Sequence, residues 1–263
     1  MATIKANNIL RQEIEIILNE AIVTVTKYNM YLVGLTGGIA TGKSTVSQIF
    51  IENHISIIDA DLIAREVVAP GENAYKKLRQ HFDNEYFDSV SGEVLRKKLG
   101  NLVFSDENTR HLVNSIIHPE IRKVIAFRIL QHFFRGEKFV VLDLPLLFEA
   151  GYAKILQKII LVDCLEDIQL KRLQQRDNID EEAAQKRIKI QYSMSDKRLR
   201  ATHIVNNSGD IEETRVQVLN LIREFNASKL HLVVRAVLLF ILLLFFLLNY
   251  LLYHIILLSL SDE

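Results

Sequence analysis

The sequence predicts an α/β protein built on a parallel sheet, and three features of the chain support this fold class. A short apolar run, Tyr31–Leu35, leads into a glycine-rich segment and then into a helical pattern over Val46–Glu52. A second run, Phe139–Asp143, has four apolar residues followed by an aspartate, and Ile159–Asp163 repeats that arrangement. Short apolar runs that alternate with helical segments are typical of parallel strands with helices on both faces of the sheet.

The glycine-rich segment fits a phosphate-binding loop. Residues 37–44 match the pattern G-x-x-x-x-G-K-[ST], between a strand and a helix as this motif requires. Such a loop turns backbone N–H groups onto phosphate oxygens, while Lys43 adds a positive charge and the Ser44 hydroxyl can ligate Mg²⁺. The alternative is a glycine-rich turn that binds nothing. The sequence thus predicts a P-loop NTPase fold, whose nucleotide-binding residues would be Gly37, Gly38, Ile39, Ala40, Thr41, Gly42, Lys43, Ser44 and Thr45.

Composition argues against one class of ligand and favours one type of compartment. The chain has 263 residues with 32 Lys+Arg and 32 Asp+Glu, so its formal net charge is zero. This balance argues against a protein that binds nucleic acid through a generally basic surface. Cys164 is the single cysteine, so no internal disulfide can form and a reducing compartment is the simpler setting.

The C-terminal segment is predicted to be a transmembrane helix. Residues 236–258 are apolar except for Asn249 and His254, and about 20 residues suffice for a helix to span a bilayer. Tyr250 and Tyr253 suit a membrane interface. The alternative is a buried core helix, but one this long and apolar on all faces is unusual in so small a protein.

Residues 1–29 are predicted to be an amphipathic extension rather than a targeting signal. Their apolar positions Leu10, Ile14 and Ile17 have helical spacing, and the acidic residues between them argue against a presequence. With no N-terminal signal and with the span at the end of the chain, we expect a membrane anchor whose globular part faces the cytosol. The few charges beside the span do not choose between the endoplasmic reticulum and the mitochondrial outer membrane.

Aspartates at the ends of predicted strands are the candidate catalytic and metal-binding groups. We expect His54–Asp61 to be a strand that ends in Asp59 and Asp61. Because ligands of open α/β sheets bind beyond the carboxyl ends of strands, these carboxylates can accept a proton from a hydroxyl or hold Mg²⁺. The alternative is capping of the following helix, Leu62–Val68, which Asp61 could do as well. Asp143 matches the Walker B position, whose carboxylate steadies Mg²⁺.

Between these strands the chain is expected to form a helical insertion over about residues 72–135. Its basic side chains can either receive an anionic substrate or form a solvated helical face. The stretch Ile117-His118-Pro119-Glu120 is expected to break the helix, because a residue before proline is disfavoured in the αR region. His118 is then either a turn residue, which the sequence favours, or a substrate contact.

A charged helical segment over about residues 166–200 follows the strand at Ile159–Asp163. Arg172 and Arg176 lie four residues apart and so share one face of a helix. Arginines on such a segment suit a lid that closes over transferring phosphates; a solvated pair of amphipathic helices is the alternative. A last short strand and turn over residues 202–209 and a closing helix over 211–225 complete the predicted domain.

Taken together, these motifs resemble the dephospho-CoA kinase family. They occur in the order and at spacings similar to those of the family, over about Tyr31 to Phe225. The resemblance implies a nucleoside-kinase-like domain over residues 30–228, made of a five-stranded parallel core, a helical substrate domain and a lid. The stretches that carry it are VGLTGGIATGKST (33–45), IIDADLIAR (57–65), IIHPEIR (116–122), LDLPLLFE (142–149), RLQQRD (172–177) and IVNNSG (204–209).

The resemblance implies a reaction. ATP, with Mg²⁺, would donate its γ-phosphate to the ribose 3′-hydroxyl of dephospho-CoA to give coenzyme A and ADP, the last step of coenzyme A biosynthesis. Lys43 would hold the transferring phosphate. Asp61, with Asp59 nearby, would be the base or the organiser of Mg²⁺.

Other matching positions receive roles in the same way. Arg172 and Arg176 would be lid arginines, Asn207 would lie near the adenine of ATP, and His118 would face the coenzyme moiety. One position departs from the pattern, because Ala40 replaces a glycine that many family members have. An alanine there is comfortable only if its φ is negative.

Two other functions stay open at this point. One is a related kinase for another nucleotide or nucleoside acceptor, whose phosphate loop and lid would look alike. The other is a nucleotide-binding membrane protein without catalysis. The combination of Lys43, Ser44, Asp61 and Asp143 with two lid arginines argues against the second, since a scaffold needs no base.

Overall fold

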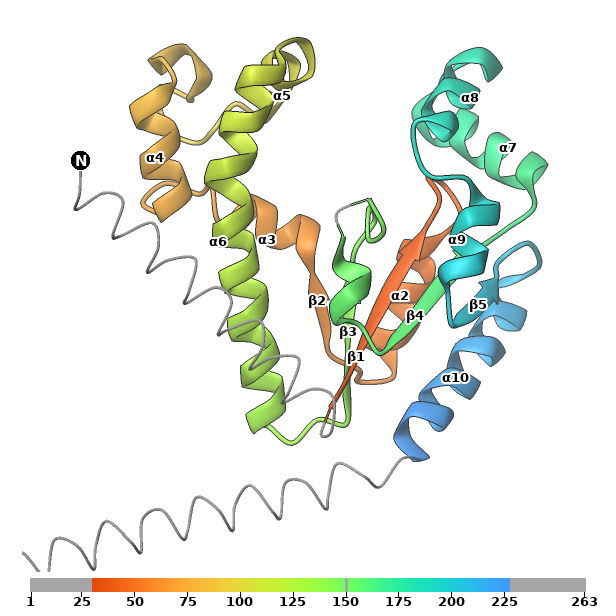
Figure 1. The fold of residues 1–263 in the computed structure, drawn as a ribbon. Helices are drawn as coiled ribbons and strands as arrows, with labels where there is room; N and C mark the ends of the chain where they lie inside the picture. The colour runs from red at the N-terminus through yellow and green to blue at the C-terminus, as the bar shows by residue number, and fades with distance from the viewer. Residues whose placement is uncertain (1–29, 150, 228–263) are drawn as a thin grey trace, which may run out of the picture.

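A computed structural model shows how the chain folds and describes residues 30–149 and 151–227 (Figure 1). These residues contain one five-stranded sheet in the order β2-β3-β1-β4-β5, and every strand pair is parallel. The five-stranded parallel core expected from the sequence is confirmed. The strands are β1 (Tyr31–Gly37), β2 (Ile57–Asp59), β3 (Phe139–Asp143), β4 (Lys158–Asp163) and β5 (His203–Asn206).

Helices connect the strands and extend beyond them. The segment between β2 and β3 is mostly helical, and so is the segment between β4 and β5, as the sequence predicts. In chain order the helices are α2 (Lys43–Glu52), α3 (Ala60–Glu66), α4 (Asn73–His81), α5 (Arg96–Ser105), α6 (Glu107–Phe134), α7 (Glu166–Asp177), α8 (Glu181–Lys189), α9 (Met194–Arg200) and α10 (Ile211–Ala227).

Side chains of the strands alternate between two apolar cores, one on each face of the sheet. In β3, Val140 and Leu142 belong to the core that α3, α4, α5 and α6 complete, while Phe139 and Val141 belong to the core of α2 and α10. The Phe139 ring packs edge to face against Phe225 of α10, with centroids 5.4 Å apart. Burial on both faces explains why the central strands are apolar throughout rather than alternating.

All strands run in one direction, so their carboxyl ends meet at one edge of the sheet. Figure 1 shows α4 and α5 rising beyond this edge on one side and α7 and α8 rising beyond it on the other. Leu35 of β1 pairs with Asp143 of β3, and Asp59 of β2 pairs with the same Asp143. The strand-end carboxylates are therefore neighbours at the edge where open α/β sheets bind ligands.

Two helices begin earlier than the sequence predicts. Helix α2 begins at Lys43 rather than Val46, because the end of the phosphate loop is itself the first turn of the helix. Helix α3 begins at Ala60 rather than Leu62, and β2 is only three residues long. The reason is that Asp59 accepts a hydrogen bond from the Leu62 N–H at 3.0 Å and so caps the helix two residues earlier.

The expected break at His118 is wrong, because α6 continues through Pro119 for 28 residues. Proline removes one helical hydrogen bond and costs about 3 kcal/mol in a helix interior. The helix buries several apolar side chains, and each buried Val or Ile contributes about 1.5–3 kcal/mol. Tertiary burial thus outweighs the local cost of the proline; the buried apolar residues are Val113, Ile116, Ile125, Ala126 and Ile129.

Two predicted segments lie outside the described residues. These are the amphipathic extension at 1–29 and the transmembrane helix at 236–258. Across the described ranges 30–149 and 151–227, no helix has both the length and the apolar character needed to cross a membrane.

Candidate active site

A cavity of about 480 Å³ lies at the carboxyl end of β1. Its walls come from the phosphate loop, the first turn of α3, the loop after β3, helix α7 and the segment between α8 and α9. The sequence places these elements far apart, and the fold brings them around one space. The lining residues are Gly38, Ile39, Ala40, Gly42, Lys43, Ser44, Asp61, Pro145, Arg172, Arg176 and Gln191.

The phosphate loop leads directly into α2. Gly42 caps the helix in the left-handed region with φ of 94°, and a Cβ added there would lie 2.0 Å from Nδ2 of Asn207. Only glycine fits this position for both reasons. Lys43 and Ser44 then form the first helical turn, where free N–H groups and the helix dipole attract an anion.

Ala40 adopts the left-handed conformation with φ of 61°. The sequence indicated that an alanine here is comfortable only with a negative φ. Its positive φ therefore strains the backbone, at a cost of about 1–2 kcal/mol. Thr41 holds the turn closed, since its N–H and its hydroxyl both donate to the Gly38 carbonyl, at 3.2 and 2.9 Å. The loop keeps its shape despite the alanine.

Lys43 forms an ion pair with Asp143, whose side chain is almost fully buried. Burial raises the pKa of Asp143, the positive charge of Lys43 opposes this, and the nearby Asp59 carboxylate raises the pKa further. The predicted Walker B aspartate therefore touches the loop lysine directly in this structure.

The two aspartates after β2 are in different environments. Asp59 is engaged as the cap of α3, through its hydrogen bond from the Leu62 N–H. Asp61 lies in the first turn of the same helix, is exposed, and lines the cavity. Asp61 is thus the more accessible of the two carboxylates at the cavity, while Asp59 caps the helix that carries it.

Both predicted lid arginines line the cavity from α7. Arg172 donates to the carbonyl of Asn207 at 2.9 Å, and Arg176 donates to Asp177 at 2.8 and 3.2 Å. With Lys43 they place three cationic side chains around the space that Asp61 borders. Such an arrangement suits a polyanionic ligand.

Asn207 supports the loop from behind. It is buried; its Nδ2 donates to the Thr41 carbonyl at 2.8 Å, and its Oδ1 accepts from the Thr214 hydroxyl at 2.9 Å. His118 lies on the exposed surface of α6, where partial desolvation and then the charge of Arg122 lower its pKa. Neither Asn207 nor His118 is among the described residues that line this cavity.

Comparison with known proteins matches this arrangement to one family. The sequence profile of dephospho-CoA kinases matches residues 31–213. The chain belongs to the dephospho-CoA kinase family. It is 44% identical over 209 residues to a dephospho-CoA kinase domain-containing protein of Danio rerio, covering 79% of this chain and 91% of that protein.

Bacterial kinases give the same result in sequence and in structure. A dephospho-CoA kinase of Bacillus licheniformis is 41% identical over 191 residues, covering 73% of this kinase and 94% of the bacterial one. A solved dephospho-CoA kinase from Campylobacter jejuni superposes with a TM-score of 0.59 at 27% identity, covering 73% of this chain and 96% of that one. The α/β fold of the P-loop kinases is therefore shared across the core.

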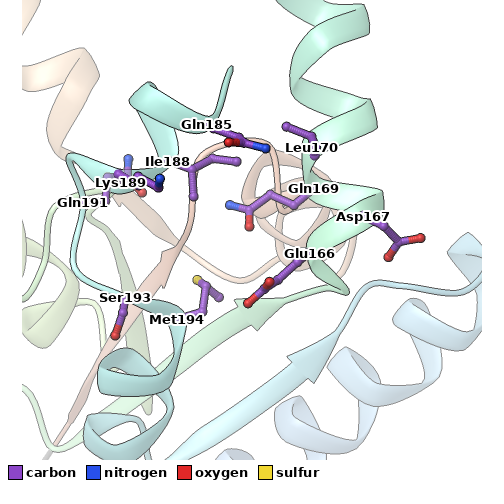
Figure 2. A pocket seen from close by; sticks show the side chains of 10 residues that line it. All are labelled: Glu166, Asp167, Gln169, Leu170, Gln185, Ile188, Lys189, Gln191, Ser193 and Met194. Carbon is purple, nitrogen blue, oxygen red and sulfur yellow. The ribbon is translucent and has the colours of Figure 1, made fainter. Parts of the chain in front are cut away.

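The kinase also uses site residues that the sequence did not indicate. Gln191 Oε1 accepts from the Ile39 N–H at 3.0 Å, and Gln169 Nε2 donates to the Ile39 carbonyl at 2.8 Å. Both glutamines also border a second cavity of about 510 Å³ between α7, α8 and the segment before α9 (Figure 2). Gln169 lies in the charged helix α7 and Gln191 in the segment between α8 and α9. Neither belongs to a sequence motif, so only the fold could reveal these contacts.

The predicted Mg²⁺ ligands of the kinase are Ser44 and Asp143. Among the described residues no group of three or more His, Cys, Asp or Glu side chains could hold a metal alone. Mg²⁺ in phosphotransferases is commonly held by one or two carboxylates together with substrate phosphates. A Ser44 hydroxyl in the cavity and a single carboxylate behind Lys43 fit a site of that kind, completed by a nucleotide.

Proposed function

We propose that this chain transfers the γ-phosphate of ATP to the ribose 3′-hydroxyl of dephospho-CoA, giving coenzyme A and ADP. The observation that carries the proposal is that one cavity joins the phosphate loop, Asp61 and two lid arginines. Family membership supports the same activity, since the matching profile and the bacterial relatives are dephospho-CoA kinases. The enzyme is then a phosphotransferase with an alcohol acceptor.

The phosphate loop is the donor side of this site. Its N–H groups and the α2 terminus receive the phosphates of ATP, and Lys43 supplies the positive charge that holds the transferring group. Lys43 exchanges its contact with Asp143 for the phosphate as ATP binds. Ser44 and Asp143 are the residues that would hold Mg²⁺, which would neutralise negative charge on the donor.

Asp61 is the proposed base for the acceptor. Its carboxylate borders the cavity and accepts the proton of the 3′-hydroxyl as the oxygen attacks phosphorus. Arg172 and Arg176 face the same space and stabilise the negative charge spread over the transferring oxygens. Phosphoryl transfer needs positioning and charge stabilisation more than covalent chemistry, and these residues supply both.

An ADP-release assay tests the proposed function. The full-length chain is given ATP and Mg²⁺ with dephospho-CoA, AMP, adenosine or pantetheine, and release of ADP is followed with a coupled enzyme. We expect turnover with dephospho-CoA and none with pantetheine, which lacks the ribose. Turnover only with AMP or adenosine would assign the site to another acceptor, and no turnover with any of them would contradict a kinase.

We also propose that residues 236–258 anchor the kinase in a membrane, either the endoplasmic reticulum or the mitochondrial outer membrane, with the kinase domain facing the cytosol. Support comes from the sequence, because the stretch is long enough and apolar enough to span a bilayer as a helix. Alkali extraction of membranes tests the proposal: an anchored protein stays in the pellet. Release into the supernatant, as for a peripheral protein, would contradict it.

A further inference from the structure

Two glutamines from the predicted lid bind the backbone of one phosphate-loop residue, Ile39. Gln191 accepts from the Ile39 N–H at 3.0 Å, and Gln169 donates to the Ile39 carbonyl at 2.8 Å. Gln169 is 2% exposed, so water does not compete effectively for its bond. Figure 2 shows the two side chains on opposite sides of the second cavity, one from α7 and one from the segment before α9. Ile39 is thereby fixed at both its donor and its acceptor.

An ion pair with one fully buried partner contacts Gln191 in turn. Lys197 of α9 is fully buried, with its Nζ 3.4 Å from Glu149 Oε1 and 3.5 Å from Gln191 Oε1. The same Glu149 oxygen accepts from the Tyr192 N–H at 3.2 Å. Glu149 belongs to the loop after β3, so this loop reaches Ile39 through three consecutive contacts.

This pair is a poor source of stability. Lys197 is fully buried, whereas the Glu149 side chain is 20% exposed. Burying a charge costs several kcal/mol, which is regained only with good geometry and additional hydrogen bonds. The contacts of Lys197 are long, and Oε2 of Glu149 is the buried side-chain polar atom without a hydrogen-bond partner among the described residues. A contact that stabilises so little, at the junction of loop and lid, points to a different role.

We propose that Glu149, Lys197 and Gln191 are positioning residues that set the orientation of the phosphate loop at Ile39. The proposal rests on the proposed kinase function. Ile39 precedes the left-handed Ala40. In a phosphate loop, turns of this kind point N–H groups toward the bound phosphates. The hydrogen bond of Gln191 to Ile39 keeps this turn in one orientation. Through Glu149 and Lys197, the loop after β3 holds Gln191 in place.

The first experiment removes the hydrogen bond of Gln191 but keeps the shape of the side chain. Gln191→Met should lower kcat on the order of 10–100-fold, because small misplacements of reacting groups have effects of this size. It should weaken binding of a non-hydrolysable ATP analogue and leave KM for dephospho-CoA unchanged, because the contact is on the donor side. The unfolding temperature should fall as well, because the Ile39 N–H and the buried Lys197 each lose an acceptor, so analogue binding is compared at a temperature where both proteins are folded.

A matched control is available in the same cavity. Gln185 also lines it, but its amide bonds Glu181 on its own helix at 2.9 Å and does not reach the phosphate loop. Gln185→Met should leave kcat and analogue binding as in the wild type. Equal losses in both variants, or a rise in KM for dephospho-CoA with kcat unchanged, would overturn the role of Gln191.

The second experiment separates positioning from stability. Glu149→Gln leaves Lys197 as a buried unpaired charge, so both the unfolding temperature and kcat should fall. Combining it with Lys197→Met removes the unpaired charge and should restore the unfolding temperature, while kcat and analogue binding stay low. Recovery of activity together with stability would show that the pair acts on the fold alone.

Failure of this proposal is distinguishable from failure of the proposed function. Binding of the ATP analogue is measured without any acceptor, so it reports on the phosphate loop whichever acceptor the kinase uses. Weakened binding in Gln191→Met but not in Gln185→Met supports the positioning role even if the wild type does not phosphorylate dephospho-CoA. Unchanged binding and unchanged kcat would overturn it in an active enzyme.

Discussion

At the scale of single residues, two aspartates that are close in sequence have different environments. Asp59 accepts the Leu62 N–H and caps α3, whereas Asp61 is exposed in the cavity. The residue type at each position is the same, and the backbone decides which carboxylate is free. Substitutions at the two positions should therefore have different effects on activity and stability.

We expect Asp61→Asn to lower kcat on the order of 10²–10⁴-fold, because it removes a general base. Its free energy of unfolding should change by no more than about 0.5 kcal/mol, as for an exposed site. Asp59→Ala should instead lose about 1 kcal/mol of stability with its cap. Steady-state kinetics and urea unfolding measure both; near-normal activity of Asp61→Asn would transfer the base role to Asp59.

Asp143 predicts a pH dependence of stability. Burial raises the pKa of its carboxyl, so the folded protein binds this proton more tightly than the unfolded chain. The resulting stabilisation is fully present below the unfolded pKa of about 3.9 and is lost as pH rises through the higher folded pKa. The free energy of unfolding of the wild type, relative to Asp143→Asn, should therefore fall as pH rises above the unfolded pKa of about 3.9.

Urea titrations at several pH values measure this difference. A difference that grows with pH would mean that the ion pair with Lys43 outweighs the burial of Asp143. Asp177 serves as the comparison, because hydrogen bonds from Arg176 lower its pKa and its contribution must have the opposite sign. The free energy of unfolding of the wild type relative to Asp143→Asn, and that relative to Asp177→Asn, should thus change with pH in opposite directions.

Ala40 predicts a stabilising substitution. Its φ of 61° lies in the region where a Cβ is unfavourable. Ala40→Gly should raise the free energy of unfolding by about 1 kcal/mol, as the relieved strain exceeds the added freedom of the unfolded chain. Thermal unfolding measures it. A loss of stability would mean that the alanine methyl group packs favourably in the loop.

At the scale of elements, α6 shows how burial overrides a local signal. Pro119 lies in the interior of this helix, and the helix continues because one face is buried from Val113 to Ile129. The exposed face carries His118, which reaches neither the phosphate loop nor the cavity lined by Asp61. The role of His118 toward the acceptor stays a prediction.

Restoring the missing hydrogen bond tests this balance. Pro119→Ala should raise the free energy of unfolding by up to about 3 kcal/mol, the cost of proline in a helix interior. Circular dichroism during urea unfolding measures the change. A variant less stable than the wild type would show that Pro119 contributes more to the packing of α6 than the restored hydrogen bond regains.

At the scale of the whole molecule, Asn207 joins three parts of the fold. It follows β5, bonds the phosphate loop at Thr41, and accepts from Thr214 of α10. Asn207→Ala leaves a buried carbonyl and a buried hydroxyl with fewer partners, which costs about 1–3 kcal/mol for each group left unsatisfied. We expect lower stability and weaker ATP-analogue binding. Unchanged binding of the analogue would confine Asn207 to a structural role.

Local patterns in the sequence determined most of the sheet and the loop. The strand at Phe139–Asp143 has the bounds that were expected, and Gly37–Ser44 forms the loop that its spacing requires. Such features depend on periodicity, glycine and residue order within about ten residues, which a sequence displays directly. The predicted anchor at 236–258 stays a prediction of the same kind.

Only the tertiary structure decided which groups meet. Lys43 and Asp143 are 100 residues apart, and Ile39 and Gln191 are 152 residues apart, yet each pair is in contact. The structure also assigned the helix cap to Asp59 and carried α6 through Pro119. These outcomes depend on burial and on hydrogen bonds between distant segments, whose free energies exceed local preferences and are not written in any short stretch of the chain.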